Sequence, residues 1–376
     1  MVLIKNKRKT LRAKEKKGKK LRKKNIRRKS IKKIKRGGAF FEDSLPDDLK
    51  KGKMLGSGSW GKVYVVNWKE NEQKKYGVLK VSEVPEGPRY QANYEVNLNE
   101  VKILKYLTEQ QNRISCPSNI SVYGFKKDDD KRKLEILMEY FCGEDLTKSF
   151  YFNMKIDMWI TIKNQLLNAV NCLHNLNVVH RDIKPENIMI NKDTLNIKMI
   201  DFGFACHKIG DELPENIVCK NFLGTRLYIS PELYMYYVND RMGSEAPRKY
   251  ENFKKITWER LIATDIWALG MTLYTVMYRK NLIELYMEKN GINPNNYDEI
   301  KSVVLKIAEP AKPVKNVISK KSDTQDEINN ETFKTFIYEQ PNNNDDIVLD
   351  TIVQLLEVDV SKRIDNFKRL VESIKT

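Results

Sequence analysis

The chain has 376 residues, of which 41% are hydrophobic and 10% aromatic, and its formal net charge is +18. This composition excludes a wholly disordered chain and allows one large domain or two of ordinary size. No apolar run reaches the roughly 18–20 residues that a membrane-spanning helix needs, and no cleavable apolar leader opens the sequence. We therefore expect an intracellular protein, cytoplasmic or nuclear, that is not secreted.

The positive charge is concentrated in residues 1–36, which carry twenty Lys or Arg and a single acid, Glu15. The rest of the chain has 48 basic and 49 acidic residues, so it is close to neutral. We predict a disordered basic tail over residues 1–38, ending at the hinge-like Gly37-Gly38. Three roles remain open: a solubilising or nuclear-import arm, binding of nucleic-acid phosphates, or binding of an acidic membrane surface or protein partner.

Five cysteines are scattered through the rest of the chain, without the spacing of a metal site. This odd, dispersed set is typical of reduced thiols in an intracellular protein, and we expect that state here. The cysteines are Cys116, Cys142, Cys172, Cys206 and Cys219.

Short β-rich segments alternate with turns from about Lys50 to Tyr140, and one helical pattern, Tyr94–Leu107, interrupts them. After Cys142-Gly143 the pattern becomes helical, and two polar stretches, 236–258 and 290–344, are interpreted as insertions or long surface loops. We predict strands at Lys62–Asn67, Tyr76–Ser82, Ser121–Phe125 and Leu134–Tyr140. We predict helices at 156–176, 264–279, 347–357 and 364–374, with one more around Tyr297–Ile307.

A glycine-rich sequence, Gly56-Ser57-Gly58-Ser59-Trp60-Gly61-Lys62-Val63, lies between strand-like segments. Glycines let the backbone adopt positive φ and approach phosphates closely. Dinucleotide-binding folds share this spacing, but there a helix follows the loop, whereas here a strand follows. We therefore predict a hairpin that covers nucleotide phosphates.

Lys80 lies in the next predicted strand, where a half-buried lysine is unusual unless an anion and a carboxylate are nearby. The predicted helix offers Glu100 as that carboxylate, with Glu95 as an alternative. We favour Glu100 because it lies one turn before the apolar Leu104.

The sequence His180-Arg181-Asp182-Ile183-Lys184-Pro185-Glu186-Asn187 precedes Asp201-Phe202-Gly203 by fourteen residues. An isolated Asp-Phe-Gly arises by chance, but the eight-residue string at this distance before it does not. Together with the glycine-rich hairpin and Lys80, these segments resemble the signatures of eukaryotic-type protein kinases. Further segments match in the same order: Gly224-Thr225, Tyr228-Ile-Ser-Pro-Glu232, Asp265-Ile-Trp-Ala-Leu-Gly270 and Arg363.

The resemblance covers about residues 48–374 and implies an α+β, two-lobed fold. The N-lobe, at about 48–140, would be β-rich with one key helix, and the C-lobe, at about 144–374, would be larger and mainly helical. The resemblance also implies that Asp265 anchors the backbone of the catalytic loop and that Arg363 pairs with Glu232.

The resemblance implies ATP-dependent transfer of a phosphoryl group to protein substrates, in which the protein aligns the reactants and neutralises charge. Asp182 would accept or orient the proton of the substrate hydroxyl, and Lys184 would neutralise charge on the transferring phosphate. A lysine at this position is typical of serine/threonine kinases, in which a residue placed like Thr225 hydrogen-bonds both side chains.

The resemblance also assigns the sites for ATP and its metal. Lys80, held by Glu100, would bind the α- and β-phosphates, while Asn187 and Asp201 would hold Mg²⁺, or Mn²⁺ in its place. Adenine would lie beside the gatekeeper, Met138, and Asp145 would approach the ribose. The full predicted ATP-binding set is Leu55, Gly56, Ser57, Gly58, Ser59, Trp60, Gly61, Lys62, Val63, Val78, Lys80, Glu100, Met138, Glu139, Phe141 and Asp145.

The activation segment departs from the family pattern. Kinases with an arginine where this chain has Arg181 commonly need a phosphate on this segment, yet residues 204–224 contain no Ser, Thr or Tyr. We predict that a carboxylate of Asp211, Glu212 or Glu215 replaces the phosphate, giving activity without loop phosphorylation. The alternative is that Arg181 faces solvent and a partner protein orders the segment.

For the whole chain, one alternative to an active kinase is a pseudokinase scaffold, which would use the fold to bind a partner without catalysis. The intact set of Lys80, Glu100, Asp182, Asn187 and Asp201 argues against it. The other alternative for the whole chain is that nucleic-acid binding through the tail is the principal function.

Overall fold

The structure, a computed structural model, describes residues 44–58, 61–83, 90–110, 116–128, 130, 133–149, 155–210, 217–309, 329–339 and 346–374. The predicted basic tail lies outside these residues, as do Ser59 and Trp60 of the glycine-rich hairpin. Asp211, Glu212 and Glu215 also lie outside them, so the replacement of a phosphate by a carboxylate stays a prediction.

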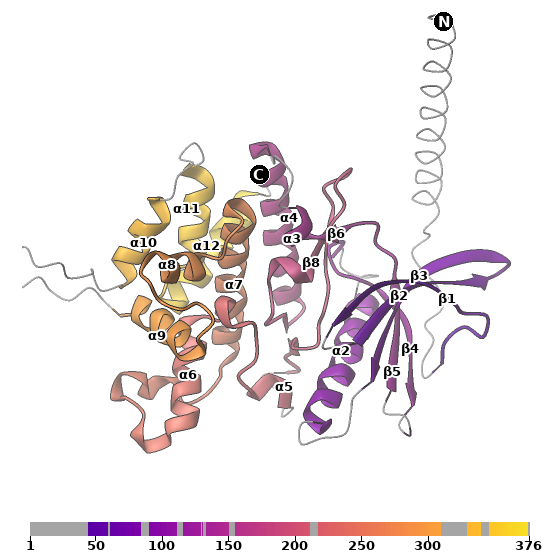
Figure 1. The fold of residues 1–376 in the computed structure, drawn as a ribbon, viewed down its shortest axis with the longest axis horizontal. Coiled ribbons are helices and arrows are strands. Elements are labelled where there is room, and N and C mark those ends of the chain that lie inside the picture. The colour runs from indigo at the N-terminus through magenta and orange to yellow at the C-terminus, as the bar shows by residue number, and fades with distance from the viewer. Residues whose placement is uncertain are drawn as a thin grey trace, which may run out of the picture. The chain divides into compact units, whose positions relative to one another are not determined.

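The N-terminal part of the described chain is an antiparallel sheet with strand order β1-β2-β3-β5-β4 (Figure 1). Alternating residues of the strands form a core beneath the sheet, in which Val66, Leu79 and Leu137 are fully buried. The strands predicted at 62–67, 76–82, 121–125 and 134–140 are confirmed as β2 to β5. The strands are β1 (Lys50–Gly58), β2 (Gly61–Glu70), β3 (Gln73–Glu83), β4 (Val122–Asp128) and β5 (Lys133–Glu139).

Helix α2 (Tyr90–Gln110) packs beside this sheet, against β4 and β5. It confirms the helix predicted at 94–107 and extends it by about one turn at its N-terminal end. Leu104 and Leu107 are fully buried, which fixes the face that α2 turns toward the sheet and so the direction of Glu100.

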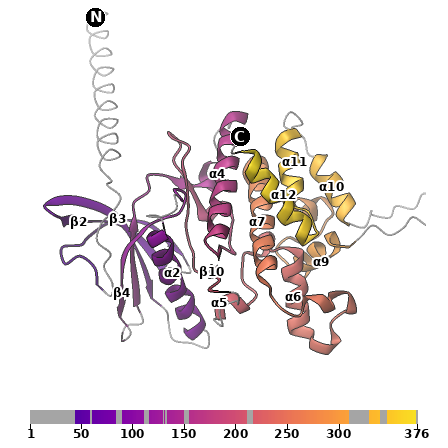
Figure 2. The same cartoon turned by 180° about the vertical axis from the view of Figure 1, so that it is seen from behind.

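The C-terminal part is mainly helical and is organised around α7 (Trp258–Tyr278), whose most extensive contacts with helices are with three others (Figures 1 and 2). These are α4 (Ile156–Asn175), α11 (Asp346–Leu355) and α12 (Val360–Ser373). The other helices after the sheet are α3 (Leu146–Ser149), α5 (Ile217–Lys220), α6 (Pro231–Met242), α8 (Leu282–Lys289), α9 (Tyr297–Ile307) and α10 (Asn330–Tyr338). The predicted two-lobed α+β fold is confirmed.

Some predicted boundaries were wrong. Helix α7 begins at Trp258 rather than at 264, because the side chain of Thr257 accepts a hydrogen bond from the Arg260 N–H and starts the helix earlier. Helix α6 continues to Met242 and is followed by 3₁₀ turns at 243–245 and 248–253, so the stretch 236–258 is largely structured. Helix α9 has the predicted bounds.

Helix α7 combines high hydropathy with burial in the core. Within the described residues it is the one helix long and apolar enough to span a membrane, and 83% of its most apolar window is buried inside the protein. Such burial is typical of the core helix of a folded domain.

Short strands position the loops that carry the predicted catalytic residues. β7 (Val178–Val179) leads directly into His180 and pairs with β10 (Cys206–His207). A second small sheet joins β6 (Glu144–Asp145), β8 (Ile188–Ile190) and β9 (Ile197–Met199). β9 ends two residues before Asp201, so the pairing of β8 with β9 brings Asn187 and Asp201 to the same end of this sheet.

The expectation of reduced thiols was wrong for four of the five cysteines. Cys116 is joined to Cys172 and Cys206 to Cys219, while Cys142 is a free thiol. The partners are 56 and 13 residues apart in the sequence, so only the fold brings them together.

Candidate active site

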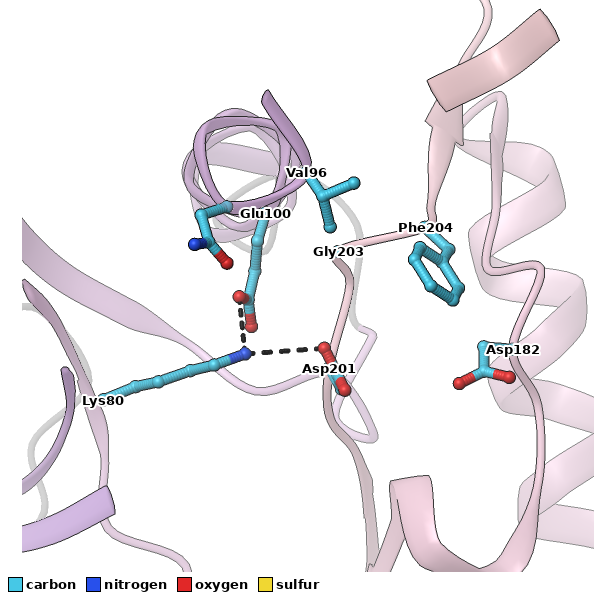
Figure 3. A pocket seen from close by; sticks show the side chains of 8 residues that line it. Lys80, Val96, Glu100, Asp182, Asp201, Gly203 and Phe204 are labelled. Carbon is cyan, nitrogen blue, oxygen red and sulfur yellow. Dashed lines mark hydrogen bonds and ion pairs between the residues drawn. The ribbon is translucent and has the colours of Figure 1, made fainter. Parts of the chain in front are cut away.

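Lys80 and Glu100 form an ion pair at the centre of the site (Figure 3). Lys80 lies on β3, and its Nζ is 2.7 Å from Glu100 Oε2 on α2 and 3.5 Å from Asp201 Oδ1. Burial alone would lower the pKa of Lys80, but the two carboxylates raise it well above its ordinary value. Burial raises the pKa of Glu100, and the charge of Lys80 opposes that rise. Lys80 is therefore a cation held between two acidic side chains.

Asp201 has a backbone conformation that few residues other than glycine adopt, with φ at 64°. Its neighbour Phe202 is fully buried and packs 4.7 Å from the His180 ring, which holds the backbone in place. Burial would raise the pKa of Asp201, but the charge of Lys80 is the main cause of a net decrease. Asp201 is therefore an ionised carboxylate at neutral pH.

Asp265, on α7, anchors the loop that carries the predicted base. Its two carboxylate oxygens accept hydrogen bonds from the main-chain N–H groups of His180 and Arg181, each at 2.7 Å. Arg181 has a φ of 66°, so this anchor maintains an uncommon backbone conformation immediately before Asp182. The anchoring role that the sequence implied for Asp265 matches this geometry.

The carboxylate of Asp182 is fixed by four donors. Its Oδ1 accepts from the Thr225 hydroxyl at 2.6 Å and from the Thr225 N–H at 3.0 Å. Its Oδ2 lies 2.9 Å from both Asn187 Nδ2 and Lys184 Nζ. Lys184 Nζ also donates to the Thr225 hydroxyl at 2.7 Å. The structure therefore brings Asp182, Lys184, Asn187 and Thr225 into one network.

The residues near Asp201 suit a magnesium ion bound together with nucleotide phosphates. The described residues contain no cluster of three or more His, Cys, Asp or Glu side chains that could hold a metal unaided. Magnesium usually binds through one or two protein oxygen ligands plus substrate phosphates. Asn187 uses its amide nitrogen on the main-chain oxygen and carboxylate of Asp182, which leaves its Oδ1 as the atom suited to a cation. The oxygens of Asn187 and Asp201 thus form a fitting donor set.

The glycine-rich hairpin has β1 paired with β2 up to its tip. Gly58 lies opposite Gly61, Ser57 opposite Lys62 and Gly56 opposite Val63. Gly61 has a φ of 126°, and a Cβ at that position would lie 2.4 Å from the Val81 carbonyl oxygen, so only glycine fits. Leu55, just before the hairpin, is half exposed.

The predicted adenine contacts come from adjacent strands. Val78 on β3 lies directly opposite Met138 on β5. The N–H of Glu139 donates to the Ser121 carbonyl oxygen at 2.9 Å, so this N–H already has a hydrogen-bond partner within the protein. Adenine would therefore have to use other main-chain groups between Glu139 and Phe141.

Asp145, the predicted ribose contact, lies at the end of β6. It accepts a hydrogen bond from the Thr147 hydroxyl, and its Oδ2 pairs with Lys148 Nζ at 2.6 Å. Although partial burial would raise its pKa, the contacts with Lys148 and Thr147 lower it. Its charge is therefore paired with Lys148, and its role as the ribose contact stays a prediction.

Two contacts fix the end of the activation segment. Ser230 is fully buried, and its hydroxyl lies 2.9 Å from the Thr264 hydroxyl, which satisfies this buried polar group. Glu232 forms a buried pair with Arg363, with Arg363 Nη1 2.7 Å from Glu232 Oε1. This is the pairing that the sequence implied.

Several pocket residues were not predicted. The cavity around Lys80 and Asp201 is also lined by Val96, Asn97 and Phe204. Figure 3 shows Phe204 and Asp182 together on the side of the cavity away from Lys80. Val96 and Asn97 lie about one helical turn before Glu100, so helical spacing was a signal that could have identified them.

A comparison with known protein families matches residues 49–373 to the protein kinase domain. The chain belongs to the protein kinase family. Among curated proteins it is similar to the Aurora kinase of Saccharomyces cerevisiae, with 30% identity over 241 residues that cover 60% of this chain and 61% of that protein. It is also similar to the Aurora kinase of Candida glabrata, with 28% identity over 232 residues, covering 61% and 54%.

A third relative is serine/threonine-protein kinase PKH1 of Saccharomyces cerevisiae, with 30% identity over 247 residues. That match covers 62% of this chain but only 28% of the relative. The match thus covers only part of each relative, 61%, 54% and 28% of their lengths, and these similarities identify the family rather than an individual counterpart.

Proposed function

We propose that this chain is an ATP- and Mg²⁺-dependent protein kinase that phosphorylates serine and threonine. The observation that carries the proposal is the network in which Thr225 and Lys184 contact each other and the carboxylate of Asp182. The names of the relatives, Aurora kinase and serine/threonine-protein kinase PKH1, support the same activity.

Each of these side chains has a task in the proposed mechanism. Asp182 is fixed by Thr225 and Asn187, so its carboxylate is already oriented to accept the proton of a substrate hydroxyl. Lys184, next to it, would stabilise negative charge that develops on the transferring group. Lys80, held by Glu100, would bind the nucleotide phosphates. Asn187 and Asp201 would hold Mg²⁺, which would neutralise phosphate charge when bound.

The test is transfer of radiolabel from γ-labelled ATP to matched peptides that differ only in the acceptor, which is Ser, Thr, Tyr or Ala. We expect label on the Ser and Thr peptides, and we expect Asp182→Asn to reduce transfer by about 10²-fold or more. Label on the Tyr peptide alone would refute the specificity. Nucleotide binding without any transfer would favour the scaffold alternative.

We propose further that activity does not require phosphorylation of the activation segment. The supporting observation is that residues 204–224 contain no hydroxyl-bearing side chain. Treatment with a protein phosphatase should therefore leave the initial rate unchanged. Glu215→Lys should lower the rate sharply if that carboxylate replaces a phosphate beside Arg181, and unchanged turnover would exclude that residue.

The basic tail remains a separate proposal, because it lies outside the described residues. Its twenty basic side chains would bind nucleic-acid phosphates with a steep dependence on salt or would act in nuclear import. Comparing DNA affinity across a salt series for the full chain and for a chain beginning at Gly38 tests the first role. Equal affinities would exclude it.

A further inference from the structure

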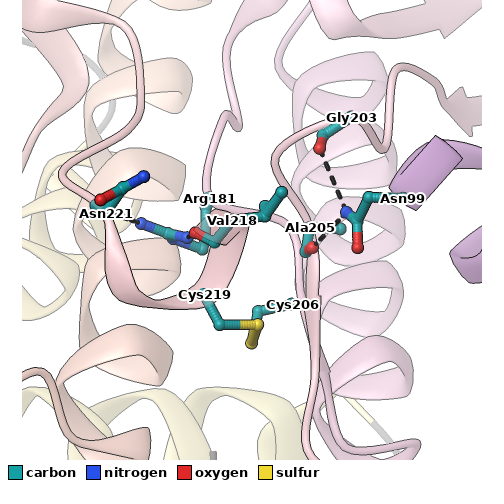
Figure 4. Close-up of a disulfide and its surroundings, with 8 residues drawn as sticks. All are labelled: Asn99, Arg181, Gly203, Ala205, Cys206, Val218, Cys219 and Asn221. Atoms are coloured by element: carbon teal, nitrogen blue, oxygen red, sulfur yellow. Dashed lines mark hydrogen bonds between the residues drawn. A yellow bond between two sulfur atoms is a disulfide. The ribbon is translucent and has the colours of Figure 1, made fainter. Parts of the chain in front are cut away.

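A disulfide joins Cys206 to Cys219 and so closes a loop within the activation segment (Figure 4). Cys206 lies on β10 and Cys219 on α5, and both side chains are fully buried. They pack with Val179 and Leu261 in a hydrophobic cluster of their own. The cross-link therefore ties the segment to itself directly beside β7, the strand that leads into the catalytic loop.

On the Cys219 side, the cross-linked backbone binds Arg181. The Arg181 guanidinium donates to the carbonyl oxygen of Val218 and, at 2.5 Å, to that of Asn221. These two carbonyls flank Cys219 in the chain. Burial lowers the pKa of Arg181 to about 10, so it remains a cation at neutral pH. No carboxylate of the described residues forms an ion pair with it, and main-chain oxygens are its hydrogen-bond partners there.

On the Cys206 side, the same backbone holds helix α2. Asn99, the residue before Glu100, donates from its amide to the Gly203 oxygen at 3.1 Å and to the Ala205 oxygen at 2.8 Å (Figure 4). One residue beyond Cys206, the His207 ring stacks on Tyr106 of α2 with ring centroids 3.9 Å apart. The backbone beside Cys206 thus contacts the helix that positions the Glu100 carboxylate.

We infer that the Cys206–Cys219 disulfide holds the activation segment in the conformation that supports catalysis, replacing a phosphate that residues 204–224 have no hydroxyl to carry. The disulfide connects the backbone that binds Arg181 with the backbone that binds Asn99. When it opens, the two stretches of backbone can move independently, and the hydrogen bonds to Arg181 and to Asn99 can break separately. The effect on turnover depends on the kinase activity proposed above. The effect on the segment itself does not.

The cross-link forms by exchange with a low-molecular-weight disulfide such as oxidised glutathione. The two cysteine thiols give up two protons and two electrons, the protein S–S bond forms, and the S–S bond of glutathione breaks to give two glutathione thiols. Because both sulfur atoms are buried, the segment must open before exchange occurs, so we expect slow reduction and reoxidation.

Closing a loop across 13 residues restricts the open states of the segment. Loop-closure entropy for this length favours the closed state by up to about 100-fold. This value is an upper limit for the loss of turnover when the disulfide opens, and we expect a loss of about 10-fold or more within it.

The experiment compares the full-length wild-type chain with two matched double variants, Cys206→Ser/Cys219→Ser and Cys116→Ser/Cys172→Ser. Each is equilibrated with oxidised glutathione or with dithiothreitol, its free thiols are mapped by mass spectrometry, and kcat and KM are measured. We expect dithiothreitol to lower kcat of the wild type and of the Cys116→Ser/Cys172→Ser variant, and reoxidation to restore it. The Cys206→Ser/Cys219→Ser variant should have a low kcat that dithiothreitol does not change.

Hydrogen exchange separates this inference from the proposed function. Reduction of the wild-type chain should speed exchange of the amides between Val218 and Thr225, whether or not the protein transfers phosphate. Unchanged exchange, or free thiols at both positions after incubation with oxidised glutathione, would overturn the inference. Faster exchange with no phosphate transfer in any state would refute the kinase proposal while supporting the disulfide as the constraint on the segment. Faster exchange with an unchanged kcat would overturn its catalytic role.

Discussion

The buried pair of Glu232 and Arg363 allows a quantitative test of what stabilises the helical lobe. Arg363 is completely buried and donates to both carboxylate oxygens of Glu232, at 2.7 and 3.3 Å. It also donates to the carbonyl oxygens of Glu357, Ala263 and Val358, which satisfy its remaining N–H groups. The substitution Glu232→Gln removes the negative charge and keeps one acceptor, with little change in shape.

Removing one partner of a buried pair costs about 3–5 kcal/mol, because an uncompensated charge remains in the interior. The amide oxygen and the three carbonyl oxygens still bind Arg363, so we expect the lower end, about 3 kcal/mol. This would be measured as the change in free energy of unfolding, from urea denaturation followed by circular dichroism.

Two variants make the test specific to the pair. Glu259→Gln removes an exposed carboxylate from the first turn of α7 and should change stability by no more than about 0.5 kcal/mol. The double variant Glu232→Leu/Arg363→Met removes both charges and should recover much of the loss. A loss below about 1 kcal/mol for Glu232→Gln, or equal losses for Glu232→Gln and Glu259→Gln, would refute the reasoning.

Three further predictions concern the site and its supports. Thr225→Val removes the hydroxyl bound to Asp182 and should lower kcat by about 10- to 100-fold in a peptide phosphorylation assay, whereas Thr225→Ser should retain most activity. Burial lowers the pKa of His207 below its ordinary value, so the unfolded chain takes up a proton on this ring more readily than the folded chain does. The free energy of unfolding should therefore fall as the pH drops below the ordinary histidine pKa. In denaturation measured across a pH series, His207→Phe should therefore lose less stability than the wild type between pH 6.5 and 5. Gly61→Ala forces a Cβ against the Val81 carbonyl oxygen and should lower the free energy of unfolding by about 1–3 kcal/mol, with no loss refuting the assigned strain.

The sequence was most informative where local pattern and tertiary packing agree. Strands β2 to β5 are short segments rich in β-branched and aromatic residues and bounded by turns, and the pattern at Tyr297–Ile307 predicted α9 with its correct bounds. Helices α8 and α10 were not predicted because each is short. Helix α10 buries only Phe333 and Ile337 of its own residues, and this small signal is masked by the polar run before it.

The candidate site was predictable to the extent that its residues lie in ordered motifs. Lys80, Asp182 and Asp201 were found in this way, although the structure shows contacts that no motif specifies. The pairing of Asp145 with Lys148 and the hydrogen bond between Glu139 and Ser121 depend on side-chain and loop placement. The same holds for the disulfides, because sequence separation contains no information on which cysteines meet in space.

Helix α7 has a consequence for how the chain is synthesised. Its apolar surface is covered partly by α11 and α12, the last two helices of the described chain. While a ribosome is still adding those helices, α7 has already been made and lacks part of its cover, so for that interval it resembles a membrane segment in length and composition. In a chain that stops before residue 346, the apolar surface of α7 that α11 and α12 cover would stay exposed. Chaperones and proteases would bind such a chain as they bind unfolded proteins.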